Sequence, residues 1–292
     1  MELVDDKLFE YSLDANKFRS LIVQSYKENK GSFKEYISYD EFRLLIKNLI
    51  FDIMKYYLDR INVVNYYGPY VRVFHFEHSG RWVSKYNEIT INEDVVSNIY
   101  EGNMRDMISI FHELVHFQMF YDINYRKLVN EDTIRIVKEE LIEDYIRENN
   151  LRENNLRSNK SYYKDNYVYL SSEIYAEKEG INLLVEFLYL VYKSVIGSKK
   201  DLYDKMYVIE EEIRKDTPDY EKRYKKKLRY FREIKEFTDK WVSYEEVFDY
   251  LVKFNSEWLE YPQISAQYEI VNGIVNKKDT NIEENVLKLM IK

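Results

Sequence analysis

The feature that most constrains this chain is a pair of histidines four residues apart inside an apolar run of helical length. His112 and His116 lie within the run 110–117 and enclose the sequence His-Glu-Leu-Val-His. Side chains at positions i and i+4 of an α-helix lie one above the other, so both imidazole rings can converge on one point. A helix that is apolar on most sides is buried, where unpaired histidines would be costly to desolvate. The run therefore predicts a buried helix over 103–121, capped by Asn103, that carries a binding site.

Zinc is the metal that such a pair of imidazoles predicts. Catalytic zinc sites use three protein ligands and leave one position open for water. Glu113 follows the first histidine and can reach a water molecule at this site, which is the position of a general base. The chain contains no cysteine, which excludes a thiolate zinc site and a cysteine nucleophile.

A third ligand must come from outside the motif. Asp122 lies six residues after the second histidine, about 240° around the helix axis, and therefore points away from the site. Glu173 is the expected ligand because it lies near the start of a predicted helix over 171–196. In that helix Ala176 and Gly180 are small enough to allow close approach to the histidine helix.

Three other carboxylates are candidates for a supporting role at this site or for the third ligand. Glu177, one turn after Glu173, is placed to accept a hydrogen bond from the outer ring nitrogen of a ligand histidine. Glu140 and Glu143 are closer to the motif in sequence and stay open as alternative ligands. They belong to a charged helix predicted over 130–146, which is more typical of a solvated surface.

These motifs resemble those of a known class of enzymes. The His-Glu-x-x-His motif, followed by an acidic pair at Glu173 and Glu177, resembles the gluzincins, the thermolysin-like zinc metallopeptidases. The strand expected over 89–92, Ile-Thr-Ile-Asn, is similar to that of the short bacterial, phage and plasmid zincins of the ImmA/IrrE-like group. The resemblance covers about residues 70–196.

The resemblance implies a function and a set of roles. Zn²⁺ would be the cofactor, held by His112, His116 and Glu173, and Glu113 would be the general base for hydrolysis of peptide bonds in a peptide or protein substrate. The interval between His116 and Glu173 is long for such enzymes, and Glu177 replaces the commoner Asp. The alternative function is that of a regulatory zinc protein of the ImmA/IrrE-like group, which binds or cleaves one specific partner with little general proteolysis.

The expected fold class is α+β and mostly helical, because the chain has only 7 glycines and 3 prolines among 292 residues. A capping box at Ser38–Glu41 opens a helix that extends to about residue 60. Two stretches rich in β-branched and aromatic residues, 70–77 and 82–91, flank a Ser79-Gly80 turn signal and predict a hairpin or small antiparallel sheet.

The predicted organisation has three segments. We expect an N-terminal helical segment over 1–66, a zincin-like metallopeptidase core over 67–200 and a C-terminal helical segment over 201–292, with a helix over about 201–214. A polar five-residue repeat over 146–164 is interpreted as an insertion, with a lid over the site as an alternative.

The other two histidines, His75 and His78, do not predict a second metal site. Residues three apart on a strand face opposite sides of the sheet and cannot easily share one ion. We expect His75 to be a half-buried strand residue and His78 to belong to the turn.

Charge and hydropathy limit which partners and which cellular location we expect. The net charge of −8 argues against a general nucleic-acid binder. The sequence shows no signal-peptide pattern, and its most apolar later stretch, 181–196, is too short and too polar to span a membrane. A cytoplasmic protein is expected; the oligomeric state and the substrate-binding residues do not follow from the sequence.

Overall fold

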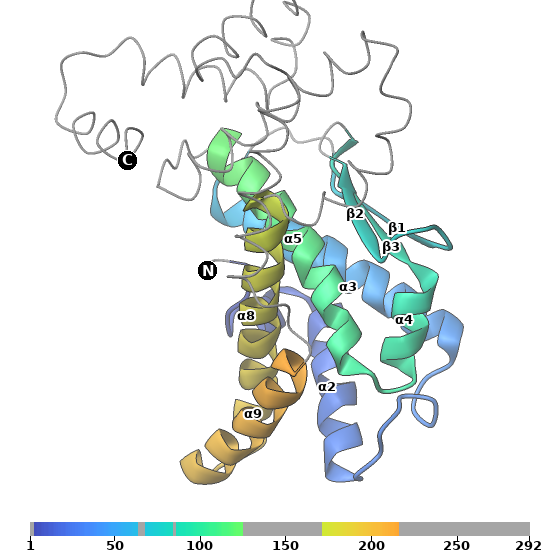
Figure 1. The fold of residues 1–292 in the computed structure, drawn as a ribbon. Coiled ribbons are helices and arrows are strands. Elements are labelled where there is room, and N and C mark those ends of the chain that lie inside the picture. Colours follow the sequence, from blue (N-terminus) through green and yellow to red (C-terminus); the bar gives the residue numbers. More distant parts are fainter. Residues whose placement is uncertain (1–2, 64–67, 84–85, 125–170, 216–292) are drawn as a thin grey trace, which may run out of the picture. The chain divides into compact units, whose positions relative to one another are not determined.

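The computed structural model describes residues 3–63, 68–83, 86–124 and 171–215. In chain order they form α1 (Leu8–Tyr11), α2 (Leu13–Lys27), α3 (Tyr39–Arg60), β1 (Tyr70–Phe74), β2 (Gly80–Val83), β3 (Glu88–Asn92), α4 (Glu93–Tyr100), the 3₁₀ helix η2 (Met104–Asp106), α5 (Met107–Asn124), α8 (Ser171–Lys193) and α9 (Lys199–Arg214). Figure 1 shows mostly helices and one small sheet, which confirms the α+β, mostly helical class for this part of the chain.

The chain divides into two compact units. The first comprises Met1–Gln118 and Ala176–Thr217, and the second comprises Met119–Tyr175 and Pro218–Lys292. Helix α8 is continuous across the boundary: its first turn belongs to the second unit and the rest to the first. The three predicted segments stay a prediction.

Helix α8 is anchored in the first unit by an aromatic cluster around Phe187. The Phe187 ring is fully buried, and its centroid lies 5.6 Å from Phe9, 6.1 Å from Phe18 and 5.7 Å from Phe111. Such ring pairs contribute about 0.5–1.5 kcal/mol each beyond the area that they bury. The cluster therefore fixes α8 against the N-terminal helices and against α5.

Two helix starts test the capping predictions. At α3 the Ser38 hydroxyl accepts from the backbone N–H of Glu41, and the Glu41 carboxylate accepts from that of Ser38, which confirms the capping box. The predicted cap of the histidine helix was wrong. Asn103 precedes η2 and donates its side-chain amide to Asp106 at 2.9 Å, and α5 begins only after this 3₁₀ turn, at Met107.

The sheet has a mixed topology rather than the predicted antiparallel one. Its strand order is β1-β3-β2, with β3 parallel to β1 and antiparallel to β2. All five residues of β3 are buried, as expected for a central strand that has a neighbour on each side. Gly80 was predicted in the turn but instead begins β2. The chain reverses direction between β2 and β3, and Asn87, with φ of 49°, lies directly before β3.

One face of the sheet packs against α3 and α5. Ile89 of β3 is fully buried, and the ring of its β2 neighbour Trp82 lies 5.3 Å from Phe117 of α5. Tyr57 of α3 contacts the same phenylalanine at 5.8 Å. Alternate residues of a strand face the same side, so Gly80, two residues before Trp82, also faces α5.

The later helices agree with the sequence where the structure describes them. Helices α8 and α9 confirm the two helices predicted over 171–196 and 201–214, although α8 ends at Lys193 and α9 begins at Lys199. No helix in the described part of the chain is both long and apolar enough to cross a membrane. The predicted helix over 130–146 and the repeat over 146–164 lie outside the described residues.

Candidate metal centre

The two histidines of α5 converge as their spacing predicts. The Nε2 atoms of His112 and His116 lie 3.1 Å apart, and the ring planes meet at 74°. Both side chains are half-buried. Two nitrogen ligands at the usual Zn–N distance in a tetrahedral site lie about 3.3 Å apart, so the pair is already close to the spacing that one zinc ion needs.

Glu173 lies close to the two histidines, and the three side chains form a group that could hold a metal ion. One ligand atom each from His112, His116 and Glu173 lie within 4.8 Å of one another. Among the residues that the structure describes, this is the one group of three or more His, Cys, Asp or Glu side chains that could hold a metal ion. The alternatives Glu140 and Glu143 lie outside the described residues.

Two small residues allow α8 to approach α5 closely. A Cβ atom built on Gly180 would lie 2.9 Å from the backbone nitrogen of His112 and 3.1 Å from its Cα. Ala176, one turn earlier, is fully buried. Glu173 precedes Gly180 by seven residues, about two turns, and so lies on the same face of α8. Figure 1 shows α8 overlapping the upper part of α5, and the short distances at Gly180 show that the two helices are in contact there.

This close approach predicts an unusual response to a glycine substitution. In a helix interior, Gly→Ala normally stabilises by about 1 kcal/mol. At Gly180 we expect Gly180→Ala to destabilise by about 1 kcal/mol or more, because the new methyl group meets backbone atoms that cannot turn away. Chemical denaturation measures the change in the free energy of unfolding. Gly197→Ala, in the link between α8 and α9, where a Cβ meets no atom within 4 Å, is the control for added bulk, and equal stability of the two variants would contradict the prediction.

Glu113 extends from α5 to the start of strand β2. Its side chain is buried, with 6% of its surface exposed. A Cβ atom built on Gly80 would lie 2.7 Å from Glu113 Cγ and 2.9 Å from its Oε1. The carboxylate therefore lies against the backbone of the first residue of β2, and Glu113 directly follows His112 in sequence.

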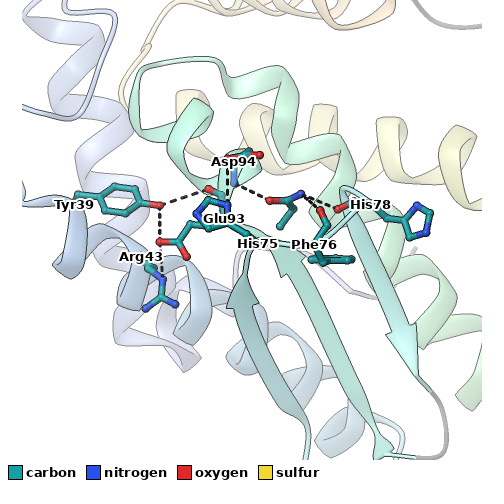
Figure 2. A network of polar contacts seen from close by, with 8 residues as sticks. Tyr39, Arg43, His75, Phe76, His78, Glu93 and Asp94 are labelled. Carbon is teal, nitrogen blue, oxygen red and sulfur yellow. Dashed lines mark hydrogen bonds and ion pairs between the residues drawn. The ribbon is translucent and has the colours of Figure 1, made fainter.

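A polar network ties α3 to β1 and to the junction of β3 and α4. Figure 2 shows Tyr39 donating to the Glu93 carboxylate at 3.3 Å, and Arg43 Nε lies 3.3 Å from the same carboxylate. Arg43 also donates to the backbone carbonyl of Val73 at 2.5 Å, which ties α3 to β1. Burial, together with the neighbouring Glu93 carboxylate, raises the pKa of Tyr39 to about 12, so its hydroxyl stays protonated near neutral pH.

The remaining candidates are not members of the group formed by His112, His116 and Glu173. His75 is not half-buried in a strand as predicted, because β1 ends at Phe74: its side chain is 72% exposed and lies 3.4 Å from Asp94. His78 is exposed in the loop, as expected. Glu177 is half-buried one turn after Glu173, and its hydrogen bond to a ligand histidine stays a prediction.

Comparison with known proteins adds no relative. No protein-family model matches the chain, and no curated protein or solved structure is significantly similar to it.

Proposed function

We propose that the chain is a zinc-dependent metallopeptidase with a zincin-like core. His112, His116 and Glu173 would hold the ion, and Glu113 would be the general base. The observation that carries the proposal is the group of three ligand atoms within 4.8 Å, with a buried glutamate next in sequence to the first ligand. Two imidazole nitrogens and one carboxylate oxygen are a donor set that zinc prefers, and three protein ligands leave a position open.

The chemistry divides between the ion and the chain. When bound, zinc supplies a Lewis acid that polarises a carbonyl group and lowers the pKa of water towards neutrality. Glu113 accepts a proton from the attacking water and later donates it to the leaving amine. Its contact with Gly80 limits the positions that its carboxylate can take, which favours a single orientation for proton transfer.

Strand β2 offers a way to hold an extended peptide. In the described part of the sheet β2 pairs on one side only, with β3. Its outer backbone edge can therefore accept a further strand, a common mode of peptide binding. Since β2 begins at the residue that contacts Glu113, a peptide added there would pass close to the general base.

The proposal is tested by metal analysis combined with a search for cleavage. Protein purified without added zinc should contain about one zinc ion per chain. It should cleave a peptide library and unfolded casein, with products identified by mass spectrometry, and a chelator should stop cleavage until zinc is restored. A chain without zinc, or a zinc-loaded chain that cleaves nothing, would overturn the proposal. Cleavage of one specific protein alone would assign the chain to the narrow, regulatory alternative.

Substitution of the acidic candidates tests the third ligand. Glu173→Ala should reduce zinc from about one ion per chain towards none, because two histidines alone leave the site with too few protein ligands. Glu140→Ala and Glu143→Ala should retain full zinc. Inductively coupled plasma mass spectrometry after gel filtration measures all three variants together. If Glu173→Ala keeps its zinc and either Glu140→Ala or Glu143→Ala loses it, the glutamate replaced in the variant without zinc is the third ligand.

A further inference from the structure

Residues 75–79 link β1 to β2 and bring Gly80 to the edge of the sheet beside α5. Gly80 pairs with Ile91 of the central strand. A side chain at this position would overlap Glu113, since a built Cβ lies 2.7 Å from its Cγ. Gly80 does not have a positive φ, so its backbone conformation is open to other residues. The requirement for glycine here is therefore one of space and not of backbone conformation.

Asn92, the last residue of β3, fixes this link. Its side-chain amide donates to the backbone carbonyls of Phe76 at 2.7 Å and His78 at 3.0 Å, and its backbone N–H donates to the carbonyl of Ser79 at 2.9 Å. Its side-chain oxygen accepts from the N–H of Asp94 and caps α4. Figure 2 shows these dashed contacts at the carbonyls of Phe76 and His78. One side chain thus joins the link to the start of a helix.

We propose that Gly80 and Asn92 are positioning residues for Glu113. Asn92 holds the link in one conformation, so that Gly80 enters β2 at a fixed place against α5. The missing side chain of Gly80 leaves the space that the Glu113 side chain fills, and the strand backbone then limits where the carboxylate can go. The inference depends on the proposed role of Glu113 as general base.

The size of the effect follows from the overlap. An ordinary contact needs about 3.4 Å, so a methyl group at Gly80 requires a relative shift of about 0.7 Å from the present 2.7 Å. Catalytic groups must be held within about 0.5 Å of the productive geometry, and a misplacement of about 1 Å can reduce the rate about 100-fold. The Glu113 side chain can rotate more easily than the paired strand can move, so the carboxylate should take most of the shift.

The test compares Gly80→Ala with Gly68→Ala, where a Cβ meets no atom within 4 Å. We expect Gly80→Ala to keep wild-type zinc and melting temperature, and to lose about 100-fold in kcat with little change in KM. The acid limb of its kcat pH profile should also shift, because the carboxylate of Glu113 has a new environment. Loss of packing alone would not shift this limb. Gly68→Ala should match the wild type in all five measurements: zinc content, melting temperature, kcat, KM and the kcat pH profile. Wild-type kcat and pH profile in Gly80→Ala would overturn the inference.

Crystal structures give a readout that does not depend on activity. In zinc-loaded Gly80→Ala the Glu113 side chain should be displaced relative to the wild type, while the zinc ligands stay in place. A displaced β2 with Glu113 unmoved would also overturn the inference. If the wild-type protein binds zinc but hydrolyses nothing, the proposed function fails, and these structures still show whether Gly80 positions Glu113.

Two variants of Asn92 distinguish its hydrogen bonds to the 75–79 link from its role as the cap of α4. Asn92→Asp keeps an oxygen for the N–H of Asp94 but loses the two donors to the carbonyls of Phe76 and His78. Asn92→Ala loses both functions. We expect a similar loss of kcat in both variants, and a lower melting temperature in Asn92→Ala than in Asn92→Asp. Full kcat in Asn92→Asp would show that the link does not position Glu113.

Discussion

Glu113→Gln is expected to abolish peptide hydrolysis while the protein keeps its zinc and its fold. Gln has nearly the same shape as Glu, so the buried contact with Gly80 is preserved, but the amide cannot accept a proton from water. General acid–base catalysis contributes about 10²–10⁴-fold, and a loss of this size is expected in kcat. Initial rates on a cleaved peptide measure the loss of hydrolysis, and the zinc content of the same sample shows whether the metal is kept.

The control for this variant is Glu211→Gln, an exposed glutamate on α9. It makes the same change of charge away from the centre and should retain the wild-type rate. Undiminished hydrolysis in Glu113→Gln would refute its role as base. Loss of zinc in Glu113→Gln would instead assign this carboxylate to metal binding.

His112→Ala is expected to lose zinc and, with it, a large part of the stability of the folded chain. A ligand at about 1,000 times its dissociation constant stabilises the folded state by about 4 kcal/mol, and this term disappears with the site. For a domain of 150–250 residues, 1 kcal/mol shifts the melting temperature by about 2–4 °C, so a decrease of about 8 °C or more is expected. Differential scanning calorimetry with zinc present measures this decrease.

A chelator separates the loss of metal from the loss of the imidazole. It should lower the melting temperature of the wild type towards that of His112→Ala and leave the variant itself unchanged. His78→Ala, which removes an exposed histidine of the loop, should respond to the chelator as the wild type does. A wild-type melting temperature that does not change on chelation would exclude a stabilising metal.

The parts of the site that depend on local geometry could be predicted from the sequence. The convergence of His112 and His116 follows from the helical repeat alone, and the Ser38 capping box involves residues only three apart. The place of Glu173 could also be inferred, because Ala176 and Gly180 mark a helix face that allows close packing. The residues of that face lie on consecutive turns of one helix and can be recognised from their spacing, although the contact that they make with α5 is long-range in sequence.

The arrangement of the sheet could not be predicted in the same way. Which strands pair depends on burial across the whole unit, and here the most buried strand takes the centre while β1 and β2 take the edges. Gly80 in a Ser-Gly pair is typical of a turn, yet it begins a strand, where its missing side chain leaves space for Glu113. Asn103 has the usual signature of a cap, but the chain forms a 3₁₀ turn before α5.

The proposed ligands lie far apart along the chain, so a bound ion would have a second consequence. From His116 to Glu173 the sequence advances 57 positions, so a bound ion would act as a reversible cross-link that closes a long loop. The entropy of closing a loop grows only with the logarithm of its length, and doubling the loop adds about 0.6 kcal/mol. The span between the two ligand helices can therefore lengthen or shorten greatly over evolution with little effect on the affinity of the centre.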